Sequence, residues 1–207
     1  MAARVKICGI NSPMAFDTAV DAGADWVGFA FFARSPRYVT PAQAAALSAR
    51  RAGGPSRVGL FVSPGMDDIA DTLAAMRLDA LQLYGAVDFA AVRARFGIPL
   101  WRAVGIAAVA DLPADCGQAD ALLIEAKAPA GATRPGGNAV TFDWSLLRGW
   151  TAPCPWLLAG GLTAENVGEA IRATGAAAVD VSSGVESAPG VKDPARIRAF
   201  IAAARAG

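Results

Sequence analysis

Hydrophobic and polar positions along the chain alternate between two patterns. Short apolar runs rich in β-branched and aromatic residues are separated by Ala-rich stretches whose apolar residues recur at helical spacing. Most successive runs begin about 20–35 residues apart, the length of one strand–helix unit. Strands are expected at Arg4–Cys8, Trp26–Phe31, Arg57–Val62, Ala80–Leu83, Leu100–Val104, Ala121–Glu125, Trp156–Ala159 and Ala178–Val181. Eight such units in 207 residues predict an α/β fold, a single-domain (β/α)8 TIM barrel over residues 1–207.

Local signals at the expected helix starts agree with this pattern. Ser12-Pro13 and Asp193-Pro194 each combine an N-cap residue with a proline at the first helical position. Thr40, followed three residues later by a glutamine, indicates a capping box. Another helix is expected to begin at Thr163, because Glu165 then places an acid in its first turn.

The segment after the first strand argues against the main alternative, an open doubly wound sheet. Such a sheet usually carries a Gly-rich fingerprint at this point, and residues 8–13 do not match it. The clearest long loop is the Gly- and Pro-rich segment Thr133–Ala139, between the sixth strand and its helix. The chain shows no linker that would separate a second domain.

Composition and charge narrow the range of partners. The chain is 54% hydrophobic and 18% charged, with a formal net charge of +1 and no run of like charges. This balance predicts no binding to nucleic acid or to an anionic membrane. No apolar run approaches the roughly 20 residues of a spanning helix. The three cysteines are far apart and match no metal-ligand spacing, so a reduced, cytoplasmic protein is expected.

The absence of histidine restricts the possible chemistry. With no histidine in the chain, Ser-His-Asp catalysis, imidazole acid–base catalysis and His-ligated zinc are excluded. Proton transfer near neutral pH must then use Cys, Asp, Glu, Lys or Tyr.

In a barrel of this kind the active site lies at the carboxyl ends of the strands. Cys8 ends the first strand and Glu125 the sixth, so the two can face each other across the barrel mouth as a base and an acid. Lys6 points to the same side as Cys8 and could favour its thiolate. The alternatives are that Cys8 is a small buried hydrophobe, and that Glu125 is a solvated strand end or pairs with Lys127.

The last two strands are followed by segments suited to binding an anion. Gly160-Gly161 allows backbone N–H groups to approach a phosphate closely, and Ser182, Ser183 and Gly184 add hydroxyl and N–H donors. Loops after strands seven and eight commonly bind phosphate in such barrels. A plain tight turn would explain either segment alone, but less easily both together.

These motifs identify a resemblance along essentially the whole chain. The sequence resembles the phosphoribosylanthranilate isomerase family in the segments at residues 5–10, 23–29, 35–39, 58–62, 81–85, 136–138, 142–144, 158–162, 179–186 and 189–193. The resemblance implies a cofactor-free and metal-free Amadori rearrangement in tryptophan biosynthesis, in which an aminoaldose becomes an aminoketose. The partner it implies is a small phosphorylated sugar–anthranilate substrate, bound by a monomer or homodimer.

The resemblance also implies roles for particular residues. Cys8 would be the general base that takes the sugar C2 proton, and Glu125 the general acid that protonates the ring oxygen. Arg37 would bind the anthranilate end, and Asp180 would orient the neighbouring loops. Other expected substrate contacts are Gly137 and Asn138, with the phosphate held by Gly160, Gly161, Ser182, Ser183 and Gly184.

Several positions depart from the family pattern. Glu125 replaces the usual Asp, Tyr84 the usual His, and Ala139 the usual Gly, while Asn11-Ser12 replaces the usual Thr-Arg. From the sequence alone, Glu125→Asp is expected to keep or raise the rate.

These departures leave alternatives to a working isomerase. The first is a catalytically impaired paralogue that serves as a sugar-phosphate-binding module. A sibling barrel such as indoleglycerol-phosphate synthase is a second, although its expected Lys/Glu set and N-terminal extension are not evident. Acceptance of a related histidine-pathway aminoaldose also stays open.

Overall fold

The computed structural model describes residues 2–129, 131, 136 and 141–207. Eight parallel strands form a closed barrel in sequence order, and β1 completes it by pairing with both β2 and β8. The strands are β1 (Arg4–Cys8), β2 (Trp26–Ala30), β3 (Ser56–Val62), β4 (Ala80–Tyr84), β5 (Leu100–Ile106), β6 (Ala121–Ala126), β7 (Trp156–Leu158) and β8 (Ala178–Val181). The predicted barrel is confirmed, and each strand boundary lies within two residues of its expected position.

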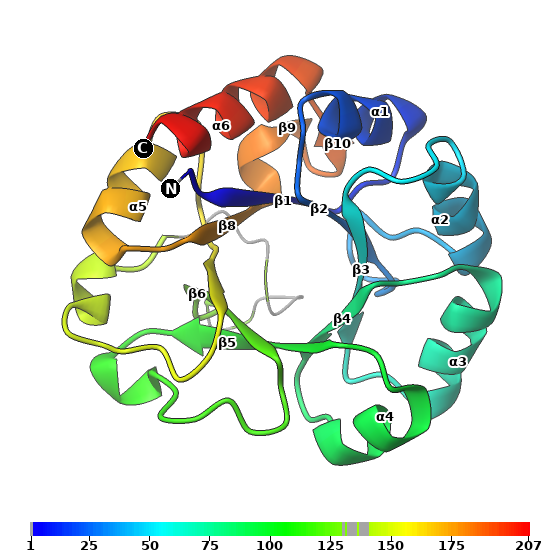
Figure 1. Cartoon of the computed structure of the whole chain (residues 1–207), viewed down its shortest axis with the longest axis horizontal. Helices are drawn as coiled ribbons and strands as arrows, with labels where there is room; N and C mark the ends of the chain where they lie inside the picture. Colours follow the sequence, from blue (N-terminus) through cyan, green and yellow to red (C-terminus); the bar gives the residue numbers. More distant parts are fainter. Residues whose placement is uncertain (1, 130, 132–135, 137–140) are drawn as a thin grey trace.

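Helices cover the outside of the barrel (Figure 1). They are α1 (Pro13–Asp21), α2 (Pro41–Ser48), α3 (Met66–Ala75), α4 (Phe89–Phe96), α5 (Val167–Thr174) and α6 (Pro194–Ala206). Between them lie the 3-10 turns η1 (Val109–Asp111), η2 (Trp144–Leu147) and η3 (Ser183–Val185). Short turns of this kind take the place of full α-helices after β5 and, within the described residues, after β6. After β8 the chain also forms an antiparallel hairpin of β9 (Glu186–Ala188) and β10 (Val191–Lys192).

The expected helix starts are confirmed except at one position. Ser12 caps α1, Asp193 caps α6, and Thr40 forms the full capping box of α2. The helix expected at Thr163 begins instead at Val167. The Asn166 side chain accepts a hydrogen bond from the Thr163 N–H, which holds residues 163–166 in a turn before the helix.

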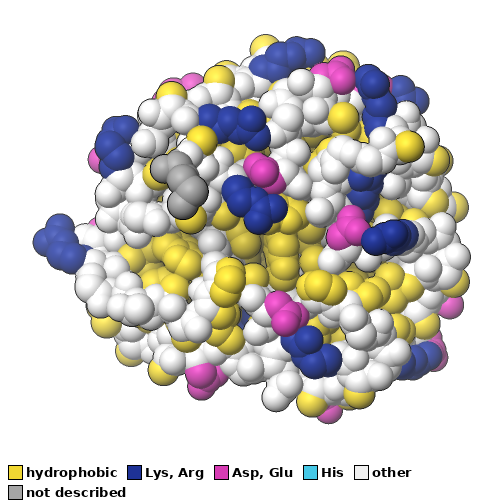
Figure 2. Space-filling view, in the orientation of Figure 1, with side chains coloured by type: hydrophobic (Ala, Val, Ile, Leu, Met, Phe, Trp, Pro, Cys, Tyr) yellow, Lys and Arg dark blue, Asp and Glu magenta, His cyan; other side chains and the backbone are white. Residues whose placement is uncertain are grey.

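Two apolar clusters fill the fold on either side of the strands. The larger contains helix and strand residues together, so it lies between the barrel and its helices. The smaller consists of side chains on or next to the strands, such as Trp26, Val58, Trp101 and Leu123, and fills the barrel interior. Alternate strand residues face the two clusters, and the strands are therefore buried on both sides. Figure 2 shows hydrophobic side chains in the hollowed centre of the end where the strands begin.

The cysteines differ from expectation. Cys116 and Cys154, 38 residues apart, form a disulfide, so the expectation of three separate reduced thiols is wrong for this pair. They precede the neighbouring strands β6 and β7, which brings their Cα atoms to 6.2 Å. Cys8 is unpaired and buried. None of the helices in the described part of the chain has the length and apolarity to span a membrane.

Candidate active site

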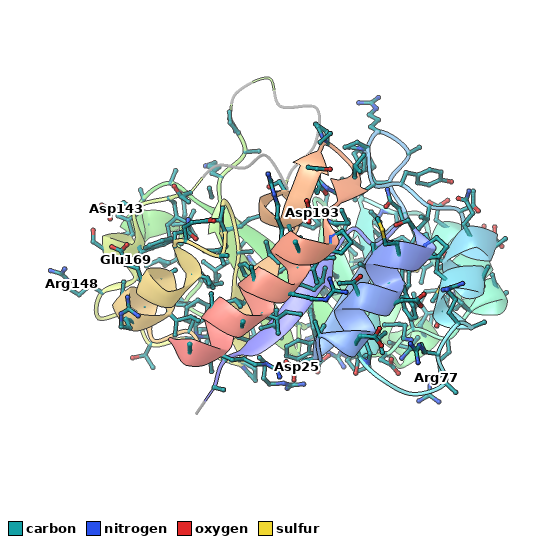
Figure 3. All side chains as sticks on the ribbon, turned by 90° about the horizontal axis from the view of Figure 1, so that it is seen from above. Asp25, Arg77, Asp143, Arg148, Glu169 and Asp193 are labelled. Carbon is teal, nitrogen blue, oxygen red and sulfur yellow. A yellow bond between two sulfur atoms is a disulfide. The ribbon has the colours of Figure 1, made fainter. Side chains whose placement is uncertain are left out.

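One cavity opens where the carboxyl ends of the strands meet. Predicted site residues that line it are Cys8, Arg37, Glu125, Gly160, Gly161, Asp180, Ser182 and Ser183. They come from strands or loops at several positions around the barrel, so closure of the sheet is what brings them together. Figure 3 shows the β9–β10 hairpin at this end of the barrel, opposite Asp25 and Arg77.

Cys8 belongs to a buried polar group where β1 meets its two neighbours. Lys6 Nζ donates to Asp180 Oδ1 at 2.7 Å, and the two residues are paired in the β1–β8 register. On the other side, Cys8 is paired in register with Gly28 of β2. A Cβ at Gly28 would lie 2.9 Å from Cys8 Sγ and 3.2 Å from Lys6 Nζ, so only glycine leaves room for both groups.

The charges in this group set the protonation of the thiol. Burial raises the pKa of the Cys8 thiol above its usual value, and Asp180 adds to that, while the Lys6 cation opposes it. Burial also disfavours the charged form of Lys6, but Asp180 and Cys8 outweigh it and raise the pKa of the ammonium. Lys6 is therefore cationic at neutral pH, and Cys8 is mainly a thiol that ionises as pH rises.

Glu125 lies across the cavity with polar neighbours from β4. Glu125 is only 5% exposed, so it is not a solvated strand end. Lys127, considered above as a partner for Glu125, contacts Asp111 at 3.7 Å. Gln82 Nε2 donates to Tyr84 Oη at 3.1 Å, which leaves the Tyr84 proton to point elsewhere. Burial and then Glu125, which is within hydrogen-bonding reach of the Tyr84 hydroxyl, raise the pKa of Tyr84 well above its usual value.

The position of Gly136 shows that Glu125 Oε1 and Tyr84 Oη lie close together. A Cβ at this glycine would lie 2.7 Å from Glu125 Oε1 and 2.8 Å from Tyr84 Oη. The backbone at Gly136 therefore touches both groups and would have to move to accept a side chain. The predicted contacts Gly137 and Asn138 lie outside the described residues.

The segments after β7 and β8 meet at the same rim. Gly160 and Gly161 both have positive φ, which only glycine adopts at little cost, and they line the cavity with Ser182 and Ser183. Gly184 has a different position: a Cβ there would lie 1.8 Å from the carbonyl oxygen of Leu162. It lets the two loops pack against each other and does not line the cavity itself.

Comparison with known proteins identifies the family. The family profile described as "PRAI: N-(5'phosphoribosyl)anthranilate (PRA) isomerase" matches residues 5–203. The chain belongs to the phosphoribosylanthranilate isomerase family. It is 58% identical over 205 residues to the N-(5'-phosphoribosyl)anthranilate isomerase of Acidiphilium cryptum, covering 99% of both chains. The corresponding enzyme of Paracoccus denitrificans is 56% identical over 212 residues, covering 100% of this chain and 99% of its own.

Solved structures agree with the sequence comparison. Phosphoribosylanthranilate isomerase from Thermotoga maritima is 36% identical with a TM-score of 0.85, covering 99% of this chain and 100% of its own. Another, 34% identical with a TM-score of 0.82 and the same coverage, was solved in complex with reduced 1-(o-carboxyphenylamino)-1-deoxyribulose 5-phosphate. The chain is therefore an aldose–ketose isomerase of tryptophan biosynthesis.

Arg37 of this isomerase has a partner that the sequence did not suggest. Its Nε and Nη2 donate to the two Glu186 carboxylate oxygens at 2.6 and 2.8 Å, while its side chain still lines the cavity. Lys192 contacts the same carboxylate at 2.8 Å. Sequence reasoning missed the roles of Glu186 and Lys192, although both lie in segments that carry the family resemblance. Their charge was the available signal, but only the fold shows that both are buried.

Proposed function

We propose that this chain converts N-(5'-phosphoribosyl)anthranilate to 1-(2-carboxyphenylamino)-1-deoxyribulose 5-phosphate, with Cys8 as general base and Glu125 as general acid. The observation that carries the proposal is that both residues line one cavity with the glycine and serine segments after β7 and β8. The phosphate would lie on Gly160, Gly161, Ser182 and Ser183. Binding energy from this remote anchor would orient the sugar between the two groups.

In the first step, Glu125 would donate a proton to the ring oxygen of the furanose as the C1–O bond breaks. The nitrogen lone pair forms the C1=N bond of a cationic Schiff base, and the ring oxygen becomes a hydroxyl. Glu125 is buried and lies within reach of the Tyr84 hydroxyl, which suits a carboxyl group that must hold and release a proton.

In the second step, Cys8 as thiolate would remove the C2 proton. The C–H bond electrons form a C1=C2 bond, and the C1=N π electrons return to nitrogen, which neutralises the Schiff base and gives an enaminol. Protonation at C1 and loss of the O2 hydroxyl proton then give the aminoketose. Lys6 supports this step because its cation lowers the cost of forming the thiolate.

Arg37 and Asp180 would hold the rest of the substrate. Arg37 remains at the cavity wall while bound to Glu186, and its planar guanidinium suits the anthranilate carboxylate. Asp180 faces the cavity with one oxygen bound to Lys6, so its carboxylate can also orient a sugar hydroxyl.

The test is turnover by Cys8→Ala, followed through the loss of anthranilate fluorescence of the substrate. We expect wild type to be active and Cys8→Ala to lose about 10³- to 10⁴-fold in kcat, the upper range for general base catalysis. Inorganic phosphate should inhibit wild type competitively, and it should bind Cys8→Ala unchanged in direct calorimetry. A near-normal rate in Cys8→Ala would refute the base assignment, and phosphate binding without turnover in wild type would indicate a binding module.

A further inference from the structure

Glu186, the first residue of β9, is the centre of a buried network that the proposed reaction does not use directly. Its carboxylate accepts both hydrogen bonds from Arg37, one from Lys192 Nζ at 2.8 Å and one from the Gly190 N–H at 3.2 Å. The Arg37 and Glu186 side chains are only 6% and 4% exposed. Four donors on one shielded carboxylate fix the Arg37 fork in a single orientation.

Lys192, the last residue of β10, links this carboxylate to the proposed phosphate seat. Its ammonium donates to the carbonyl oxygen of Ser182 at 2.8 Å and also lies 3.2 Å from Ser182 Oγ. With the bond to Glu186, each of its three protons has an acceptor, and the side chain is 0% exposed. Ser182 Oγ in turn donates to the carbonyl oxygen of Cys8 at 3.1 Å. The network therefore runs from Arg37 to the backbone of the proposed base.

The hairpin that carries both residues is itself held against the barrel. Gly190, at its turn, has positive φ, and a Cβ there would lie 2.4 Å from the carbonyl oxygen of Pro36, next to Arg37. The Asn11 side chain donates to the Gly190 carbonyl oxygen at 2.8 Å. The hairpin thus packs tightly against the loop of Arg37, and its position fixes the distance between that loop and Ser182.

The charges of the network do not cancel. Although burial disfavours the ionised carboxyl, Arg37 and Lys192 lower the pKa of Glu186 to about 2. Burial lowers the pKa of Lys192 to about 8, with Glu186 opposing. At neutral pH the network holds two cations and one anion, and the Lys192 cation is the one that contacts Ser182 at the seat of a phosphate.

We propose that Glu186 and Lys192 are positioning residues that fix Arg37 and Ser182 relative to each other, so that the anthranilate carboxylate and the phosphate of one ligand are bound at a set separation. This rests on the proposed function for the identity of the two ligand groups. Lys192 supplies charge and alignment at the phosphate seat, and Glu186 aligns Arg37. Neither side chain is placed to touch the reacting atoms.

The first experiment compares Lys192→Met with wild type, because this change leaves Arg37 and Glu186 as a neutral pair. We expect the Kd for inorganic phosphate and the KM to rise about tenfold each, the order of one charge-assisted contact, with kcat changed by less than about twofold. The matched control is Arg77→Met, which removes a cation whose side chain is 91% exposed at the opposite end of the barrel. Unchanged phosphate affinity in folded Lys192→Met overturns the proposal, even if its melting temperature falls.

A second measurement uses wild type and so does not depend on a variant folding. The chain has only three lysines, Lys6, Lys127 and Lys192, which makes side-chain NMR of the lysines simple to assign. Saturating inorganic phosphate should raise the pKa of Lys192 because an anion is brought close to its ammonium. Lys127, exposed and beside Asp111, should be unmoved. A Lys192 pKa that phosphate leaves unchanged overturns the role at the phosphate seat.

Glu186→Gln tests the other half of the network. The loss of the carboxylate charge should weaken binding of anthranilate itself more than binding of phosphate, whereas Lys192→Met should do the reverse. The matched control is Glu169→Gln on α5. Equal effects of Glu186→Gln and Glu169→Gln on anthranilate binding overturn the role of Glu186. These fragment affinities are measured without turnover, so failure of the proposed reaction is distinguishable from failure of this inference.

Discussion

The two sides of the cavity are built differently. On the side of Cys8, the described neighbours are an ion pair, Lys6 with Asp180, whose members lie on adjacent strands and are paired in register. On the side of Glu125, the described neighbours include a tyrosine hydroxyl and, behind it, the Gln82 amide. The thiol is thus influenced by nearby charges, while the carboxyl group also depends on the direction of a hydroxyl proton.

This difference suits the roles of base and acid proposed for Cys8 and Glu125. A thiolate needs a cation nearby, and Lys6 provides one that Asp180 keeps in place. A carboxylic acid holds its proton more readily when it is buried, as Glu125 is, and the Tyr84 hydroxyl is one neutral neighbour. The predictions below test whether each side works as its neighbours indicate.

On the side of Glu125, the largest effect is expected from Glu125→Gln, which keeps the shape of the side chain and removes the transferable proton. We expect kcat to fall by about 10²- to 10³-fold, within the range of general acid catalysis. The affinity for inorganic phosphate should not change, since Glu125 is not among the residues proposed to hold the phosphate. Glu169→Gln is the matched surface control. If the Glu125→Gln variant and the wild-type protein turn over equally, the acid lies elsewhere.

The next prediction concerns the pH dependence of the ionisation of Cys8. The base must be ionised, and burial raises the pKa of this thiol, so the thiolate fraction should rise about tenfold per pH unit between pH 7 and 9. We therefore expect the thiolate absorbance of the unliganded protein, measured as wild type minus Cys8→Ala in the ultraviolet, to rise by up to about 100-fold over this range. The rate kcat would not isolate the thiol, because a general acid that loses its proton as pH rises cancels the gain in thiolate. A thiol that is already fully ionised at pH 7 contradicts the raised pKa of Cys8.

The side of Cys8 could be predicted from the sequence more completely than the side of Glu125. The two-residue period of a strand places Lys6 and Cys8 on the same side, and the barrel rule places both at the rim. The position of Glu125 follows from the same rule. Its contact with Tyr84 does not, because Tyr84 lies on β4 and only the curvature of the closed sheet brings the two oxygens together.

The network of Glu186 was hidden for a related reason. The network joins residues of separate loops and strands, and they meet only because the β9–β10 hairpin folds back against the barrel. Its members are Arg37, Ser182, Glu186 and Lys192. In the sequence, Glu186 and Lys192 resemble surface charges beside a turn. The disulfide was missed in the same way, since 38 residues separate two cysteines that precede neighbouring strands.

The smallest effect is expected from Tyr84→Phe, which removes only the hydroxyl that faces Glu125. We expect kcat to fall about tenfold, the order of one hydrogen bond to a charged group, with little change in KM.

A double-mutant cycle with Glu125→Asp shows whether this contact explains the longer side chain. Shortening Glu125 withdraws its carboxylate from Tyr84 Oη by about one C–C bond, so the structure favours a loss of rate in place of the gain expected from the sequence alone. In Tyr84→Phe the same shortening takes away no hydrogen bond to that hydroxyl and should cost less. Residues in contact show such coupling, whereas independent sites are additive. Additive effects on kcat would mean that Tyr84 does not position the acid, and that the length of Glu125 is accommodated by the backbone of β6.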